Sequence, residues 1–225
     1  LINEQFEEGD FSYEFESWAK QVVDFCEQVI KKKVILIGNS IGGVIALRAS
    51  QLLEDNCLKV VLIDCAQRTM DDKRLKEQSP LMQLVQPYLK NLVRQRWLSQ
   101  NLFRIASSKF VIKKVLQQAY PSGNNINEGL ISLLQIPSQR SGASEAFRGF
   151  INLFDDYLAP SLMANIKVPV HMIWGEKDPW EPIEMAKEWF SSISCIHTLQ
   201  VIENAGHCPH DEAPEKVNPL IIELL

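Results

Sequence analysis

The chain of 225 residues has a formal net charge of −5, and hydrophobic residues make up 46% of it. This is enough apolar sequence to bury the core of one large domain, or of one domain with an insertion. Because the charge is negative and the basic residues are scattered along the chain, no nucleic-acid partner is expected. No apolar run reaches the roughly 18 residues that cross a bilayer, so no transmembrane segment is predicted. The five cysteines form no CxxC pair, which favours buried thiols in a reducing compartment.

The first predicted element is a helix at 12–31, because apolar residues recur there at helical spacing on one face: Phe15, Trp18, Val22, Phe25 and Val29. An apolar strand follows at 33–37 and runs directly into Gly38-Asn39-Ser40-Ile41-Gly42-Gly43. The pattern then predicts a helix at 41–53.

A strand-to-helix turn this tight holds its serine in strained backbone and pushes the Oγ atom out above the sheet. We expect glycine to be required at Gly38 and Gly42, where the chain segments cross closely. Ser40 is therefore the predicted nucleophile. The backbone N–H of Ile41, at the start of the helix, is the predicted oxyanion-hole donor.

After a buried strand at 58–63, the alternation of strand and helix stops. Residues 65–165 show helical periodicity instead, and we interpret them as a helical cap that forms a second hydrophobic layer over the core. One helical face contains Leu81, Leu84, Val85, Tyr88, Leu89 and Leu92, and Pro87 is expected to kink this helix. A second helix is predicted to begin with Phe103, Ala106, Phe110 and Val111. Loops are expected at 121–125 and 137–144, and a last short helix at 145–154.

The cap is rich in Leu, Phe and Met, which favours an apolar acyl or alkyl group in the substrate. Its basic residues are interpreted as a solvated face, for example Arg94, Arg96, Lys113 and Lys114. Contact of the cap with a membrane surface or a pigment complex remains an open alternative.

Strands predicted at 168–174 and 198–202, with a helix at 183–190 between them, restore the core, and a helix at 214–225 closes the chain. Asp178 follows the first of these strands and His207 follows the second. Open α/β sheets gather their chemistry at the carboxyl ends of strands, so Ser40, Asp178 and His207 are expected to meet there. The predicted organisation is a first part of the core at 1–64, the cap at 65–165 and the rest of the core at 166–225.

In this arrangement His207 would act as general base and Asp178 would orient its ring. Asp64, which follows the earlier strand, is the alternative acid, and His210 is the alternative base. The trio His207, Cys208 and His210 matches no zinc spacing, so neither a metal nor a cofactor is predicted. His171 lies within a strand and is interpreted as a buried histidine with a polar partner.

Three segments, at 38–43, 174–182 and 205–218, together resemble the pheophytinase-like α/β-hydrolases of cyanobacteria and plastids. The run Gly-His-Cys-Pro-His-Asp-Glu-Ala-Pro at 206–214 is the most particular of them, and a further likeness lies at 141–144 with Phe147. The resemblance implies an α/β-hydrolase fold with a mostly parallel sheet and a helical cap. On the matching positions, Ser40 would be the nucleophile, Asp178 the acid and His207 the base.

The activity implied is hydrolysis of a carboxylic ester with a lipophilic substrate, such as the phytyl ester of pheophytin or chlorophyll-type pigments. The implied location is a plastid or the cytoplasm of a cyanobacterium. A general esterase, a carbon–carbon bond hydrolase of the same fold and an inactive hydrolase-like binding protein remain alternatives. Ser40 at the turn excludes haloalkane dehalogenases and epoxide hydrolases, which need an aspartate there.

Several strands normally precede the nucleophile strand in this fold, and one of their loops donates half of the oxyanion hole. Only residues 1–33 precede it here. We therefore expect the chain to be a fragment without its first strands, and to be nearly inactive. The strand at 33–37 would then expose an unpaired apolar edge, which is a predicted aggregation site.

Overall fold

A computed structural model of the chain describes residues 13–151 and 153–225. Its centre is a four-stranded sheet in which every neighbouring pair is parallel. The order in the sheet follows the chain: β1 (Val34–Asn39), β2 (Cys57–Ile63), β3 (Val170–Gly175) and β4 (Ile196–Ile202). The parallel α/β core predicted from the sequence is confirmed. Each of the four strands lies within three residues of its predicted position.

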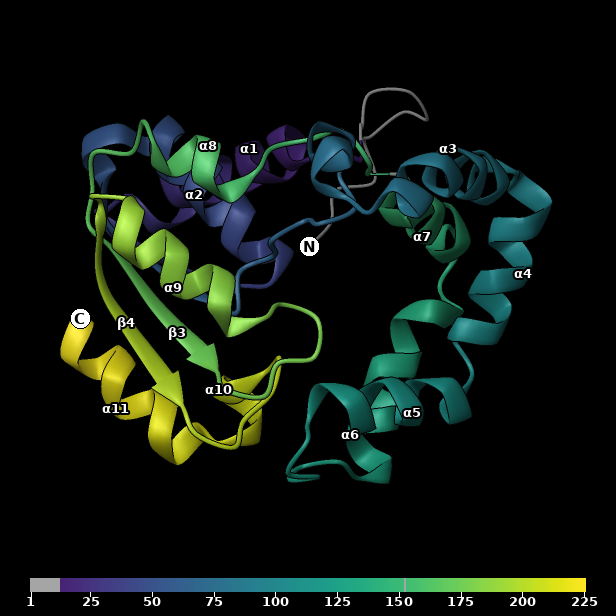
Figure 1. Cartoon of the computed structure of the whole chain (residues 1–225). Helices are drawn as coiled ribbons and strands as arrows, with labels where there is room; N and C mark the ends of the chain where they lie inside the picture. Colours follow the sequence, from purple (N-terminus) through teal and green to yellow (C-terminus); the bar gives the residue numbers. More distant parts are fainter. Residues whose placement is uncertain (1–12, 152) are drawn as a thin grey trace.

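Helices cover both faces of the sheet (Figure 1). One face carries α1 (Phe15–Phe25), the π-helical turn η1 (Cys26–Ile30), α2 (Ile41–Leu53), α8 (Ala159–Met163) and α9 (Ile183–Ser192). The other face carries α11 (Pro214–Leu224). Alternate residues of β2 enter the two cores, since Val60 and Leu62 belong to the first and Val61 and Ile63 to the second. Both faces of this strand are therefore buried, which explains its continuous apolar sequence.

All regular elements among the described residues of the cap are helices. The cap forms an arc of helices beside the sheet (Figure 1). These are α3 (Pro80–Arg94), α4 (Arg96–Ala106), α5 (Lys109–Ala119), α6 (Glu128–Gln135) and α7 (Ala143–Ile151), with short 3-10 turns η3 (Asp72–Glu77) and η4 (Ile136–Gln139). Between α9 and α11 lies the single-turn helix α10 (Pro209–Glu212). The predicted boundary of the cap at residue 165 stays a prediction. Just before it, the α8 residues Ala159, Leu162 and Met163 belong to the core cluster.

Two predicted helices of the cap have different limits in the structure. Phe103 and Phe110 lie on separate helices, because Ser108 caps α5 by accepting a hydrogen bond from the Val111 N–H. The predicted loop at 137–144 contains η4 and the start of α7.

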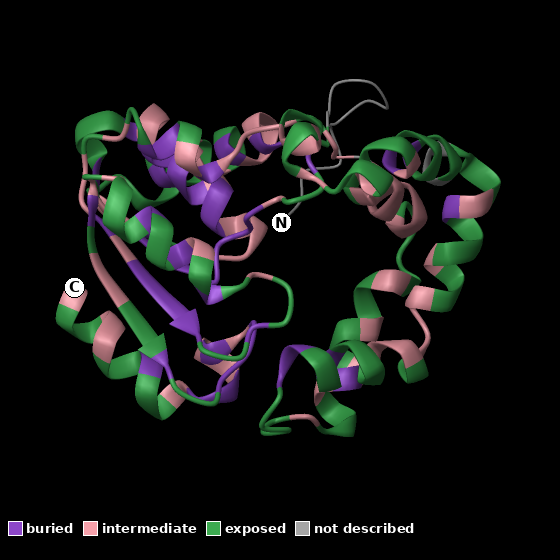
Figure 2. Ribbon diagram, in the orientation of Figure 1, coloured by how far each residue is buried: buried purple, intermediate pink, exposed green. Residues whose placement is uncertain are grey.

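Some predicted buried faces are exposed. The α3 face is mostly exposed rather than packed on the core, and so are Phe25 and Val29 at the end of the first helix. A π turn begins at Cys26 and places this cysteine in the core instead. Most buried residues lie in the strands and the helices on them, and few lie in the cap (Figure 2). All five cysteines are free, with Cys26, Cys57 and Cys65 buried.

In the described part of the chain, β1 is an edge strand and Ile37 is half exposed on it. The aggregation expected from this edge stays a prediction. None of the described helices combines the length and apolar sequence that crossing a bilayer requires.

Candidate active site

The turn between β1 and α2 has the strained geometry that the sequence predicts. Ser40 occupies it with φ 55° and ψ −124°, a region that non-glycine residues rarely adopt. Hydrogen bonds on both sides hold this backbone: the Ser40 N–H donates to the Ile63 carbonyl (3.0 Å), and the Ser40 carbonyl accepts from the Ala66 N–H (3.1 Å). The strain is therefore sustained by the neighbouring strand β2 and the loop after it.

The two predicted glycine requirements have different outcomes. A Cβ atom at Gly38 would lie 2.2 Å from the Gly42 carbonyl oxygen, so glycine is needed at Gly38. At Gly42 a Cβ atom would meet nothing within 4 Å, so the expectation for Gly42 is wrong. The close approach lies one residue later, since a Cβ atom at Gly43 would lie 2.8 Å from Cys65 Sγ.

Asp178 and His207 meet at the carboxyl ends of β3 and β4. His207 Nδ1 lies 2.7 Å from Asp178 Oδ2. The other carboxylate oxygen, Asp178 Oδ1, accepts from the N–H groups of Trp180 (2.8 Å) and Glu181 (3.1 Å). Burial opposes the charge on Asp178, but these hydrogen bonds, led by that from His207, hold its pKa below the usual value. An ionised Asp178 therefore fixes the His207 ring with Nδ1 as the donor.

Asp64, the alternative acid, follows β2 and is fully buried. Its Oδ1 accepts from the Gly175 N–H (2.8 Å), while Oδ2 has no hydrogen-bond partner among the described residues. Burial raises the pKa of Asp64 well above its usual value, and the nearby charge of Asp178 adds to this effect. The Asp64 carboxyl group therefore holds its proton more tightly than usual, and its hydrogen bond comes from a backbone N–H rather than from His207.

Asn39 connects the serine turn to the histidine loop, and the sequence analysis assigned it no role. Its Nδ2 donates to the carbonyl oxygens of Ile63 (3.1 Å) and His207 (3.0 Å). The residue directly before Ser40 is therefore bonded to the main chain of His207. The only sequence signal was its place inside the glycine-flanked motif.

Glu212 also belongs to this arrangement, although the sequence predicts no role for it. Its buried carboxylate accepts hydrogen bonds from the N–H groups of Gly206 (2.6 Å) and Ser122 (2.7 Å) and from the Ser122 hydroxyl. In addition, the His207 N–H donates to the Ala119 carbonyl (2.9 Å). The connection between α5 and α6 therefore holds the loop that carries His207.

The remaining histidines of the sequence analysis lie outside this arrangement. His210 is largely buried, and burial lowers its pKa. Its Nδ1 has no hydrogen-bond partner among the described residues. His171 is half-buried rather than buried, and its Nδ1 lies 2.9 Å from Thr198 Oγ1, so it has the expected polar partner.

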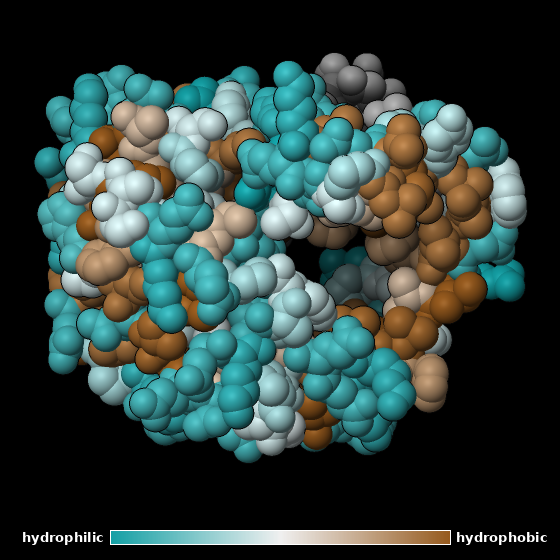
Figure 3. All heavy atoms as spheres, in the orientation of Figure 1, coloured by the Kyte–Doolittle hydropathy of each residue, from teal (hydrophilic) through white to brown (hydrophobic). Residues whose placement is uncertain are grey.

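An open apolar groove of about 460 Å³ runs along the cap. Figure 3 shows hydrophobic side chains bordering a hollow between the cap and the core. The groove is lined by residues of α3, α4, α5 and α7 and of the segments that join the cap to the core: Met70, Gln86, Leu89, Lys90, Leu102, Ile105, Ala106, Val111, Phe147, Ile151 and Phe154.

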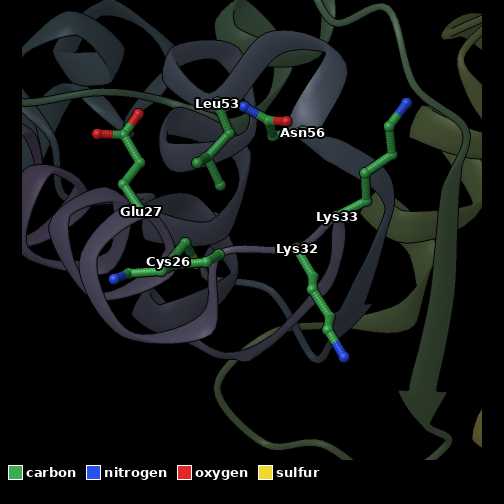
Figure 4. A pocket seen from close by; sticks show the side chains of 7 residues that line it. Cys26, Glu27, Lys32, Lys33, Leu53 and Asn56 are labelled. Carbon is green, nitrogen blue, oxygen red and sulfur yellow. The ribbon is translucent and has the colours of Figure 1, made fainter.

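A second pocket of about 430 Å³ lies between η1, the end of α2 and the residues before β1, with Lys32 and Lys33 at its rim (Figure 4). Lys33 and Asn56 precede β1 and β2, so this pocket is at the amino ends of the strands, away from Ser40 and His207. Catalytic sites of such sheets lie at the opposite edge.

Three similar proteins come from different organisms. The chain is 27% identical to the "Uncharacterized hydrolase YugF" of Bacillus subtilis over 96% of its own length and 73% of that protein. It is 31% identical to "Monoacylglycerol lipase ABHD6" of Mus musculus, over 89% and 57%. It is 25% identical to "Pheophytinase, chloroplastic" of Arabidopsis thaliana, over 93% and 44%. The chain thus spans about half the length of the last two relatives.

Solved structures have the same fold. An esterase from Thermogutta terrifontis superposes with a TM-score of 0.69 at 21% identity, over 95% of this chain and 72% of the other. An esterase from Exiguobacterium antarcticum superposes with a TM-score of 0.70 at 19% sequence identity, over 95% of this chain and 74% of the other. A family profile described as "Alpha/beta hydrolase family" matches residues 7–220. On this match, and on the fold that carries it, the chain belongs to the alpha/beta hydrolase family.

Proposed function

We propose that the chain hydrolyses carboxylic esters with Ser40 as nucleophile, His207 as general base and Asp178 as the acid that orients the base. The observation that carries this proposal is the hydrogen bond between His207 Nδ1 and Asp178 Oδ2. It leaves His207 Nε2 free to act as a base, on a loop that Asn39 bonds to the serine turn. The strained Ser40 backbone supports the same assignment, because nucleophile turns of this fold store such strain.

In the first step Ser40 Oγ attacks the ester carbonyl while its proton passes to His207 Nε2. The ionised Asp178 stabilises the imidazolium that forms. The proton then passes from His207 to the departing alcohol, leaving an acyl group on Ser40. A water molecule attacks this acyl-enzyme with His207 again as the base; His207 then returns the proton to Ser40 Oγ as the bond to the acyl group breaks and the carboxylic acid leaves.

The oxyanion of each tetrahedral intermediate would accept a hydrogen bond from the Ile41 N–H. Ile41 is the first residue of α2, and the first N–H groups of a helix have no partner within the helix. The positive end of the helix dipole lies at the same place. Loss of one such donor typically lowers kcat by about 10²–10³-fold, so the second donor of the hole matters for the rate.

We propose a lipophilic substrate, because the groove in the cap is lined almost wholly by apolar side chains. Two similar proteins bear names that point the same way, one a monoacylglycerol lipase and the other a pheophytinase. Long-chain monoacylglycerols and the phytyl ester of pheophytin are therefore the first substrates to test. If the substrate is the phytyl ester, we propose that the protein acts in a plastid or in the cytoplasm of a cyanobacterium.

The test combines a fluorophosphonate probe with p-nitrophenyl esters of increasing acyl length. We expect Ser40 to be labelled, Ser40→Ala to take no label, and longer acyl chains to be preferred. Absence of label on the full-length protein, or label on Ser40→Ala, would refute the nucleophile and leave a binding protein. A preference for the shortest ester would refute the lipophilic substrate and favour a general esterase.

Two aspartate variants test the acid. Asp178→Asn should lower kcat by about 10⁴-fold, as the wrong imidazole tautomer does in other triads. Asp64→Asn is the matched control and should change kcat little, because Asp64 bonds the Gly175 N–H rather than His207, and Asn keeps that acceptor. A larger loss in Asp64→Asn would reverse the assignment.

A further inference from the structure

The charges of the chain are divided between the cap and the core. Residues 80–151 contain nine of the 23 lysines and arginines but only two of the 28 aspartates and glutamates. The formal charge of this segment is therefore +7, whereas the rest of the chain has −12. The basic residues are scattered along the whole chain, as expected, and the asymmetry arises because acidic residues are scarce at 80–151. We propose that the exposed faces of α3, α4 and α5 dock on an anionic lipid surface.

The outer face of α3 is apolar although it faces solvent. Leu81, Leu84 and Tyr88 are 70%, 71% and 77% exposed, and they recur at helical spacing. With 3.6 residues per turn, they lie on the side of the helix opposite to the buried residues Gln86 and Lys90. An amphipathic helix in a protein surface normally presents polar residues there, so this face is inverted.

The next two helices combine aromatic and basic side chains on their solvent faces. On α4, Trp97 is exposed, and Arg104 lies seven residues later on the same face. On α5, Phe110 is 70% exposed, and Lys113 and Lys114 follow on its face, opposite the buried Leu116 and Ala119. Figure 3 shows a band of hydrophobic side chains that runs over these helices on one side of the cap.

The basic side chains of this surface are available to a partner. Of the basic residues described at 80–151, Arg96 and Arg148 form ion pairs with Glu145, and Lys90 forms one with Asp72. Among the described residues, no carboxylate forms an ion pair with Arg104, Lys113 or Lys114. Arg96 is therefore paired with a carboxylate as well as solvated. Arg104, Lys113 and Lys114 remain available to bind an external anion.

The chemistry of the surface selects its partner. Exposed aromatic and leucine side chains flanked by lysine and arginine are the composition of surfaces that lie in the interface of a bilayer. The charge of +7 on residues 80–151 attracts anionic headgroups and repels a second copy of the same segment. The rest of the chain, with a formal charge of −12, is repelled by the same bilayer and would face away from it.

The apolar groove lies on the other side of these helices. Its lining residues Gln86 and Lys90 are on the α3 face opposite Leu81, Leu84 and Tyr88. The docking surface is therefore separate from the groove, and the docking does not rest on the proposed function.

The experiment is flotation of the whole chain with two kinds of vesicle, phosphatidylcholine alone and phosphatidylcholine with about one third phosphatidylglycerol. We expect binding to the anionic vesicles, little binding to the neutral ones, and weakening in high salt. Lys113→Gln with Lys114→Gln should lower the partition coefficient about thirtyfold, since each surface lysine contributes about fivefold. Trp97→Gln with Phe110→Gln should also lower it.

The matched control is Lys32→Gln with Lys187→Gln, which removes two exposed lysines from the core. It should leave binding unchanged, and all variants should keep the parent's circular dichroism and fluorophosphonate labelling. Equal loss in the control, equal binding to both vesicles, or no binding together with self-association at the same concentration would overturn the proposal. Labelling reports on the proposed function separately, so the two failures are distinguishable.

Discussion

The buried carboxylate of Glu212 offers a test of how the cap holds the histidine loop. In Glu212→Gln one carboxylate oxygen becomes an NH₂ group, while the N–H groups of Gly206 and Ser122 both still point at the side chain. Whichever way the amide turns, it opposes one of these two donors. The variant thus loses a hydrogen bond to a charged group and leaves a buried N–H unpaired.

Each of these two effects is worth about 1–3 kcal/mol, and they overlap, so we expect a loss of about 3 kcal/mol in the free energy of unfolding. For a chain of this size the melting temperature should fall by roughly 6–12 °C. Gly206 directly precedes His207, so the variant should also displace the base. At temperatures where the variant is still folded, its kcat for a soluble ester should be at least about tenfold lower than that of the parent.

Thermal unfolding followed by circular dichroism measures the first effect, and kcat at about 20 °C measures the second. The control is Glu215→Gln, which makes the same chemical change on an exposed side chain of α11 nearby. If Glu212→Gln melts within about 2 °C of Glu215→Gln, the carboxylate does not hold the loop, and the reasoning is refuted.

Two further predictions concern the backbone of the serine turn and the pH dependence of stability. Gly38→Ala should destabilise the chain by about 1–3 kcal/mol in urea denaturation, because its Cβ would lie 2.2 Å from the Gly42 carbonyl oxygen. Gly42→Ala should be neutral or stabilising, since it has open space in a helix; equal losses would contradict the crossing geometry. Burial raises the pKa of Glu181 to about 7. The folded state therefore keeps a proton that the unfolded state releases near pH 4.5, so the free energy of unfolding falls as the pH rises from about 4.5 to about 7. Glu181→Gln should remove this fall, gaining up to about 3 kcal/mol over the parent between about pH 5 and pH 8, and a pH-independent difference would disprove the shift.

The core elements were predictable because local pattern and tertiary role agree in them. The apolar residues of β2 are buried on both faces, and the α2 range 41–53 is the same in prediction and structure. The cap was less predictable. The apolar spacing of Leu81, Leu84 and Tyr88 predicts a helix correctly, but periodicity says nothing of whether an apolar face meets the core or the solvent.

The sequence by itself determined the positions of Ser40, Asp178 and His207 at strand ends, because motifs and strand patterns are local properties of the chain. The tertiary structure decided which carboxylate meets His207, since Asp64 and Asp178 both follow strands and differ only in burial and in hydrogen bonds from other segments. It also decided the roles of Asn39 and Glu212, whose partners lie up to 168 residues away in the chain. Contacts at such separations arise from the packing of the whole sheet and cap, and no local pattern encodes them.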